Sequence, residues 1–244
     1  MNVNAYTYGV LGFGTVGQAQ VQYLKSLGVN TENISIYDPN TDFLGRPEER
    51  DFIFICVGTG SEEGDFKAVK ECLNNINSVN RHTAVIIRTT LLPERYPILE
   101  AIVPELVYIP EFLNQNSSLD DEISFKKIIL GGNPLYTSEV EFLYKGKEIM
   151  HTTLEQASWI KYTHNLYSIH KMLFWEMIQD LTEDFGGARL MYKGYSTHKT
   201  PDMEVVGLDG YRGIGGKCFP ANLEAVKDKH ELLKALYDYN KKLK

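Results

Sequence analysis

The sequence has 244 residues, which corresponds to one large domain or two small ones at roughly 100–200 residues per domain. Hydrophobic residues make up 43% and charged residues 23%, as in ordinary globular proteins, so a disordered or collagen-like chain is excluded. The net charge of −7 gives no global electrostatic reason to bind nucleic acid.

Composition also argues against a membrane or extracellular setting. The longest apolar runs, such as 52–57, are far shorter than the ~20 residues that cross a bilayer, and the polar start does not resemble a secretory signal. The three cysteines, Cys56, Cys72 and Cys218, are odd in number and far apart, which favours a reducing compartment over a disulfide framework. The six histidines lack metal-ligand spacing. We therefore expect a cytoplasmic protein without a membrane span or a bound metal.

Strands and helices are predicted to alternate up to residue 134. The apolar patterns predict strands at 6–11, 33–37, 51–57, 83–87, 106–109 and 127–130, and helices at 16–27, 65–76 and 96–102. Strands that are almost wholly apolar are typical of a parallel sheet covered on both faces. The sequence therefore predicts a doubly wound α/β domain over residues 1–150.

The pattern changes after the last predicted strand. Residues 154–185 contain neither Gly nor Pro, and apolar side chains recur every three or four positions, which predicts one amphipathic helix of about 45 Å. The glycines at 186–187 are expected to end it, a Gly- and Asp-rich loop follows over 199–219, and a last helix is expected to begin near Pro220. Residues 151–244 are thus predicted to form a helical second domain.

A glycine-rich turn joins the first predicted strand to the first predicted helix. Residues 12–17 read Gly-Phe-Gly-Thr-Val-Gly, and this GxGxxG spacing permits a tight turn, close approach of a pyrophosphate and close helix–strand packing. Asp38 follows the second strand, where a carboxylate accepts from ribose hydroxyls and repels a 2′-phosphate, so NAD is favoured over NADP. The alternative is a turn that only packs. The residues predicted to bind NAD in this Rossmann-type fold are Gly12, Gly14, Thr15, Val16, Gly17 and Asp38.

Five further motifs occur along the chain. They are CVGT at 56–59, RTTLLP at 88–93, YIPEFL at 108–113, KYTHN at 161–165 and GIGGKCFP at 213–220. Each is weak alone, but together and in this order they resemble the UDP-glucose/GDP-mannose dehydrogenase family from about residue 5 to the end. The resemblance implies oxidation of a sugar C6 alcohol to a carboxylate by two NAD, through a cysteine thiohemiacetal and a thioester.

The resemblance also implies catalytic roles. Cys218 would be the nucleophile, and Lys161 and Asn165, one turn apart on a helix, would stabilise the oxygen that becomes negative. Glu111 would be the general base for thioester hydrolysis, and Thr90 would position a water or touch the cofactor. The alternatives are an inert loop cysteine, a solvated lysine and an ordinary surface acid.

Further binding residues follow from the same motifs. By resemblance, Val57, Gly58, Thr59 and Thr90 would line the NAD site. The substrate would contact Phe112, Leu113, Gly215, Gly216 and Asn222.

The sequence departs from the family pattern in four ways. A lysine and a catalytic aspartate of the family are replaced by Ala221 and Asn222, and a glutamate by Gln115. An amide cannot accept the proton that a carboxylate would. The connection over 38–51 is too short for the family's helix and longer loop. We also expect the C-terminal nucleotide-sugar domain of the family to be absent from this chain, or to be supplied by another chain.

Three functions remain open on these observations. The first is an NAD-dependent dehydrogenase of a sugar or nucleotide sugar acting through Cys218, in which the amide replacements could slow the thioester step or stop oxidation at the aldehyde. The second is a degenerate protein that binds NAD with little catalysis. The third is a two-electron hydroxyacid dehydrogenase of the 6-phosphogluconate type, which needs no cysteine. By resemblance, we expect a homodimer through the long helices, with each active site partly completed by the partner chain.

Overall fold

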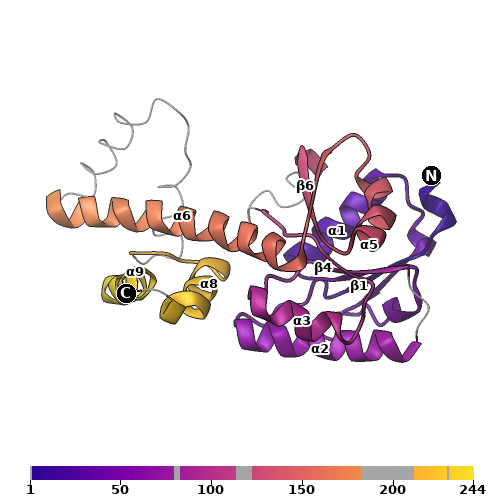
Figure 1. Cartoon of the computed structure of the whole chain (residues 1–244), viewed down its shortest axis with the longest axis horizontal. Helices are drawn as coiled ribbons and strands as arrows, with labels where there is room; N and C mark the ends of the chain where they lie inside the picture. Colours follow the sequence, from indigo (N-terminus) through magenta and orange to yellow (C-terminus); the bar gives the residue numbers. More distant parts are fainter. Residues whose placement is uncertain (1, 80–82, 114–122, 183–211, 230) are drawn as a thin grey trace. The chain divides into compact units, whose positions relative to one another are not determined.

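The computed structural model describes residues 2–79, 83–113, 123–182, 212–229 and 231–244 (Figure 1). The chain divides into two compact units, Met1–Lys161 and Tyr162–Lys244. The division lies within the long helix α6 (Leu154–Thr182), a little beyond the expected boundary at residue 150.

The described part of the first unit contains a seven-stranded sheet in the order β2-β1-β3-β4-β5-β6-β7. Its strands are β1 (Tyr8–Leu11), β2 (Ile34–Tyr37), β3 (Phe52–Ile55), β4 (Ala84–Ile87), β5 (Leu106–Tyr108), β6 (Lys127–Gly132) and β7 (Glu148–Thr152). Neighbouring strands are parallel except β5 and β6. The predicted α/β fold is confirmed, and the sheet is mostly parallel, with β6 running antiparallel to β5.

The two differences from the predicted sheet have physical reasons. An apolar run marks a strand but not its direction, which depends on the path of the connecting chain, so the reversal of β6 carries no local signal. Strand β7 was not predicted because it is an edge strand whose side chains are partly or fully exposed, and it therefore has no apolar run.

Helices cover both faces of the sheet (Figure 1). On one side are α1 (Thr15–Ser26) and α5 (Pro134–Val140), and on the other are α2 (Glu62–Val79) and α3 (Tyr96–Glu100). Short 3-10 helices occur at Val3–Ala5, Thr31–Asn33, Pro47–Glu49, Pro93–Arg95 and Glu141–Tyr144.

Side chains alternate along the central strands and thereby build two separate cores. Phe52 and Phe54 point into the core that contains α1 and α5, whereas Ile53 and Ile55 point into the core that contains α2 and α3. All four side chains are fully buried. This arrangement explains why the strands are apolar at every position rather than at alternate ones.

The second unit has a core of its own. The later turns of α6 contribute Ile169 and Met172, which pack with Ile214 and with Leu223 of helix α8 (Cys218–Val226). A 3-10 turn at Lys227–Lys229 separates α8 from α9 (Glu231–Leu243).

The C-terminal helices differ from the prediction. Helix α8 begins at Cys218 rather than near Pro220, so the cysteine is the first helical residue and not a loop residue. Proline is tolerated there because it lies in the first turn, where its missing N–H removes no intrahelical hydrogen bond. The expected helix end at 186–187 and most of the loop at 199–219 lie outside the described residues.

None of the described helices is both long enough and apolar enough to span a membrane.

Hydrogen bonds between Asp51 and Thr7 join the starts of β1 and β3. The carboxylate Oδ2 of Asp51 accepts from the backbone N–H of Thr7 at 2.7 Å and from its hydroxyl at 2.8 Å. We expect Asp51→Ala to lower the free energy of unfolding by about 1–3 kcal/mol, because two partly buried donors lose a charged acceptor. Urea unfolding measures this, with the exposed Asp42→Ala as the control. Equal unfolding midpoints for the two variants would contradict it.

Candidate functional site

The predicted glycine turn lies between the end of β1 and the start of α1. Gly12 has a φ of 89°, and a Cβ there would be 2.7 Å from the carbonyl oxygen of Cys56. A Cβ on Gly17 would be 2.0 Å from the carbonyl oxygen of Gly12. At Gly14, no described residue places a heavy atom within 4 Å of a Cβ, its chain neighbours aside. The turn is therefore tightly packed at its first and third glycines and open at the second.

The carboxylate of Asp38 is fixed beside this turn. Its Oδ2 accepts from the backbone N–H of Phe13 at 2.7 Å, and its Oδ1 accepts from that of Asn40 at 2.9 Å. These hydrogen bonds, that from Phe13 first, hold the pKa of Asp38 below its usual value. The group is thus an ionised acceptor at the end of β2, where it was predicted.

The connection after Asp38 folds back along β2 instead of forming a helix. The backbone N–H of Asp38 donates to the carbonyl of Phe43, and that of Gly45 to the carbonyl of Ile36. The ring of Phe43 packs edge-on against Phe13 in the glycine turn, with 4.7 Å between centroids. The short connection therefore lies directly beside the turn.

The predicted residues that follow β3 and β4 lie at the same end of the sheet as the glycine turn, because β1, β3 and β4 are parallel. The N–H and hydroxyl of Thr59 both donate to Oδ1 of Asp65, at 2.5 and 2.9 Å. Burial raises the pKa of Asp65 despite these two donors. Thr89, which was not predicted, links the two strand ends through a hydrogen bond of 2.7 Å to the carbonyl of Val57. Gly58 lies between Val57 and Thr59.

Glu111 and Lys161 form a buried ion pair. The Nζ of Lys161 is 3.0 Å from Oε1 of Glu111, and their side chains are 6% and 11% exposed. The other carboxylate oxygen accepts from the N–H of Leu113 at 2.9 Å, and the ammonium lies 5.2 Å from the ring centroid of Phe112. The structure thus brings Lys161 together with the consecutive residues Glu111, Phe112 and Leu113.

The charge state of Glu111 depends on its neighbours. Burial alone would raise the pKa of Glu111, but the Lys161 ammonium, the Leu113 N–H and the Arg88 guanidinium together hold it below its usual value. The pKa of the Tyr108 phenol is shifted in the opposite direction, since burial and the Glu111 charge both raise it.

Arg88 is the residue of this site that was missed. It is buried at the end of β4, where a guanidinium Nη1 donates to Oε1 of the buried Gln20 at 2.5 Å. The sequence carries no local signal for this burial, because arginine is ordinarily exposed unless it is paired, and its partner Gln20 is far away in the sequence.

The second unit contains the remaining predicted residues. Asn165 of α6 and Asn222 of α8 are both buried, and the side-chain Nδ2 of Asn165 donates to Oδ1 of Asn222. Cys218 is exposed at the first position of α8 and follows Gly215 and Gly216. Gln115 lies outside the described residues. The described residues contain no group of three or more His, Cys, Asp or Glu side chains suited to a metal.

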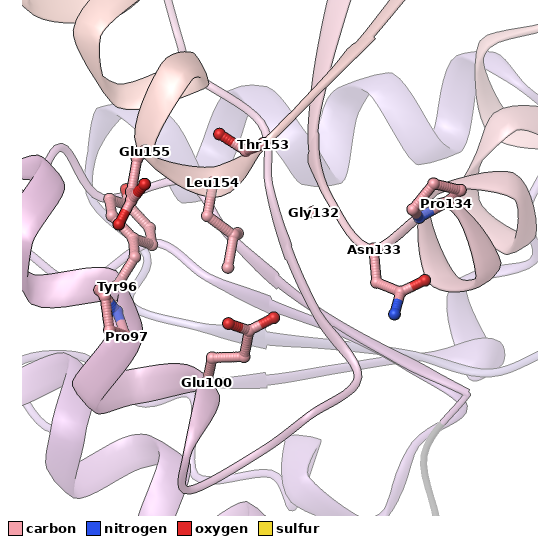
Figure 2. Close-up of a pocket in the computed structure, with 9 residues that line it drawn as sticks. All are labelled: Tyr96, Pro97, Glu100, Gly132, Asn133, Pro134, Thr153, Leu154 and Glu155. Atoms are coloured by element: carbon pink, nitrogen blue, oxygen red, sulfur yellow. The ribbon is translucent and has the colours of Figure 1, made fainter.

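A cavity of about 370 Å³ occurs elsewhere in the first unit, and Figure 2 shows the residues around it. Its lining comprises Tyr96, Pro97, Glu100, Gly132, Asn133, Pro134, Thr153, Leu154 and Glu155. Gly132 ends strand β6, which runs antiparallel to β5, and it pairs with Val107. It therefore lies toward the amino ends of the parallel strands, whereas the glycine turn lies at their carboxyl ends. The cavity contains none of the predicted site residues.

Comparison with known proteins identifies the family of the chain. The sequence profile of the "UDP-glucose/GDP-mannose dehydrogenase family, NAD binding domain" matches residues 22–147. This chain belongs to the UDP-glucose/GDP-mannose dehydrogenase family. The profile match starts beyond the glycine turn, and it includes Asp38, Thr59 and Glu111.

Individual relatives within the dehydrogenase family are distant. UDP-glucose 6-dehydrogenase of Rickettsia felis is 27% identical over 213 residues, which cover 78% of this chain and 47% of that protein. The chain spans about half the length of the curated relatives it matches.

Two solved structures have the same fold. A UDP-glucose dehydrogenase from Pyrobaculum islandicum has a TM-score of 0.70 at 19% identity and covers 98% of this chain and 67% of that one. The 3-hydroxyisobutyrate dehydrogenase of Mycobacterium tuberculosis has a TM-score of 0.72 at 13% identity and covers 97% of this chain and 93% of that one.

The buried ion pair gives a stability prediction. We expect Lys161→Met to lower the free energy of unfolding at neutral pH by about 3–5 kcal/mol, because it leaves the Glu111 carboxylate buried without its partner. Adding Glu111→Gln should restore most of the loss, as urea unfolding would show. A double variant as unstable as Lys161→Met would contradict the pairing.

The same pair predicts a pH dependence. Because the folded-state pKa of Glu111 lies below its ordinary value, this carboxylate stabilises the fold above the ordinary carboxyl pKa of ~4.3. That contribution is lost as the pH falls through the folded-state pKa. We therefore expect the wild-type protein to lose more stability than Glu111→Gln between neutral pH and about pH 3. An equal loss of unfolding free energy in the two proteins over this pH range would refute the prediction.

Proposed function

We propose that the chain is an NAD-dependent dehydrogenase that oxidises a primary alcohol of a sugar or nucleotide sugar towards the acid through Cys218. The observation that carries the proposal is the buried Lys161–Glu111 pair, which places a cation and a carboxylate together just after β5. In parallel α/β sheets, ligands bind at the carboxyl ends of the strands. Membership of the family supports the same reaction class.

The glycine turn at residues 12–17 and the nearby Asp38 carboxylate suit a bound dinucleotide. The open space at Gly14 admits a pyrophosphate to the start of α1, where free N–H groups favour negative charge. Asp38, held ionised, keeps acceptor capacity for ribose hydroxyls and repels a 2′-phosphate, so NAD is preferred over NADP. Thr15, Val16 and the strand-end residues 57–59 would complete the cofactor contacts. When bound, NAD supplies the hydride acceptor for the oxidations.

The residues of the chain supply the rest of the chemistry. The Cys218 thiolate adds to the aldehyde carbon from the first oxidation, so a C–S bond forms and the carbonyl oxygen becomes negative. The Lys161 ammonium and the Asn165 amide stabilise that oxygen. Loss of the second hydride gives a thioester. Glu111 takes a proton from the attacking water, the C–S bond breaks, and the acid leaves with regeneration of the thiolate.

The hydrogen-bonded side-chain amides of Asn165 and Asn222 favour a second candidate function. Asn222 is buried and its Oδ1 accepts from Asn165, and an amide cannot take up a proton as a carboxylate can. If formation of the thioester depends on a proton acceptor at that position, oxidation stops at the aldehyde after one hydride, and the chain is a two-electron dehydrogenase. A hydroxyacid dehydrogenase of the 6-phosphogluconate type would share Lys161 and Asn165 and would need no cysteine.

We also propose a homodimer formed through α6. Tyr167 and Phe174 are 63% and 42% exposed on this helix, and large exposed apolar side chains are a feature of protein interfaces. The cytoplasm is the compartment that suits the three free cysteines.

Removal of the Asp38 carboxylate tests cofactor binding. We expect Asp38→Ala to weaken NAD binding about 10-fold or more, because hydrogen bonds to a charged acceptor are lost. Discrimination against NADP should fall at the same time. Calorimetric titration measures both affinities, with Asp42→Ala as the control on the same connection. Unchanged NAD affinity would exclude Asp38 from the cofactor site.

Counting NADH tests the reaction. With NAD and a panel of UDP-, GDP- and free sugars, we expect two NADH per sugar from the wild-type protein and loss of acid production in Cys218→Ser. One NADH per sugar, unaffected by Cys218→Ser, would support the two-electron candidate instead. Clear NAD binding without turnover of any sugar would refute the dehydrogenase proposal for this chain.

A further inference from the structure

The last helix of the chain contacts the backbone that leads to Cys218. The side-chain Oδ1 of Asn240, in α9, accepts from the backbone N–H of Ile214 at 2.8 Å. Asn240 is 8% exposed, so this hydrogen bond is shielded from water. Gly213 has a φ of 85°, and a Cβ there would be only 2.4 Å from the same oxygen. The glycine therefore permits an approach that any other residue would block.

The same segment is fixed by its other neighbours. The guanidinium of Arg212 pairs with Oε2 of the buried Glu176 in α6 at 3.1 Å. The Ile214 side chain is fully buried against Ile169 and Leu223. Residues 212–214 thus carry an ion pair, a backbone hydrogen bond and a buried side chain.

Only three residues separate this fixed point from Cys218. They are Gly215, Gly216 and Lys217, and such a segment spans at most about 14 Å from Ile214 to Cys218. Two glycines alone would leave the cysteine backbone free to move, because glycine restricts the chain least. The anchor at Ile214 limits that freedom at one end, and helix α8 limits it at the other.

We propose that Asn240 is a positioning residue for Cys218, which it holds at the first turn of α8 through the Ile214 backbone. The role in catalysis rests on the proposed function, whereas the effect on the thiol does not. A thiolate at a helix N-terminus is stabilised by free N–H groups and the helix dipole. Lys217, at the N-cap, makes no side-chain capping hydrogen bond, so the N–H groups of the first turn are not capped by that side chain.

Thiol alkylation tests the proposal without NAD or sugar. We expect Asn240→Leu to slow iodoacetamide alkylation of Cys218 at pH 7 roughly two- to five-fold, the rate change that corresponds to a helix-terminal charge interaction. Cys218 is already exposed, so a looser backbone gains little access and mainly loses thiolate. Asn240→Asp keeps an acceptor oxygen and should react at the wild-type rate. Asp238→Asn, exposed on the same helix, is the control.

Peptide mass spectrometry assigns the alkylation to Cys218 rather than to Cys56 or Cys72, and thermal unfolding is measured in parallel. If Asn240→Leu does not fold, Gly213→Ala, which displaces the segment from Asn240, should slow alkylation in the same way. A lower melting temperature with an unchanged alkylation rate would overturn the proposal, as would an Asn240→Asp protein as slow as Asn240→Leu. Altered alkylation in a protein that oxidises no sugar would retain the positioning role and refute only the dehydrogenase proposal.

Discussion

Burial of the central strands on both faces is the constraint on which the site depends. Strands β1, β3 and β4 have no solvent-facing side, so their side chains can only build the two cores. Polar side chains of the sheet region are therefore found in the residues that follow these strands. The glycine turn, Thr59, Arg88 and Glu111 all lie in such positions. The fold thus brings these strand-end side chains to one end of the parallel strands.

The second constraint is the energetic cost of burying charge. Lys161 and Glu111 compensate each other at 3.0 Å, and the buried Arg88 lies close enough to influence Glu111. An ion pair of this kind adds little to stability compared with an apolar pair, but loss of one partner is costly. The pair joins the segment that follows β5 to helix α6.

Much of the first unit was predictable from the sequence, because apolar periodicity and glycine spacing are local signals. The strand positions, the glycine turn and the place of Asp38 follow from them. The reversal of β6 and the edge strand β7 have no local signal, since strand direction depends on the chain path. The pairings Lys161–Glu111 and Asn165–Asn222 join residues far apart in sequence, so the motifs supplied the members but not the contacts. The burial of Arg88 likewise depends on Gln20, a partner far away in the sequence, and has no local signal.

The most direct test of the covalent role of Cys218 is a single-turnover acid quench. The protein would be mixed with NAD and the 6-aldehyde of a nucleotide sugar, quenched, and digested for mass spectrometry. We expect a sugar acyl group on the peptide that contains Cys218, formed together with NADH. NADH formation with Cys218 unmodified throughout the turnover would show that oxidation proceeds without the thioester and would contradict the cysteine mechanism.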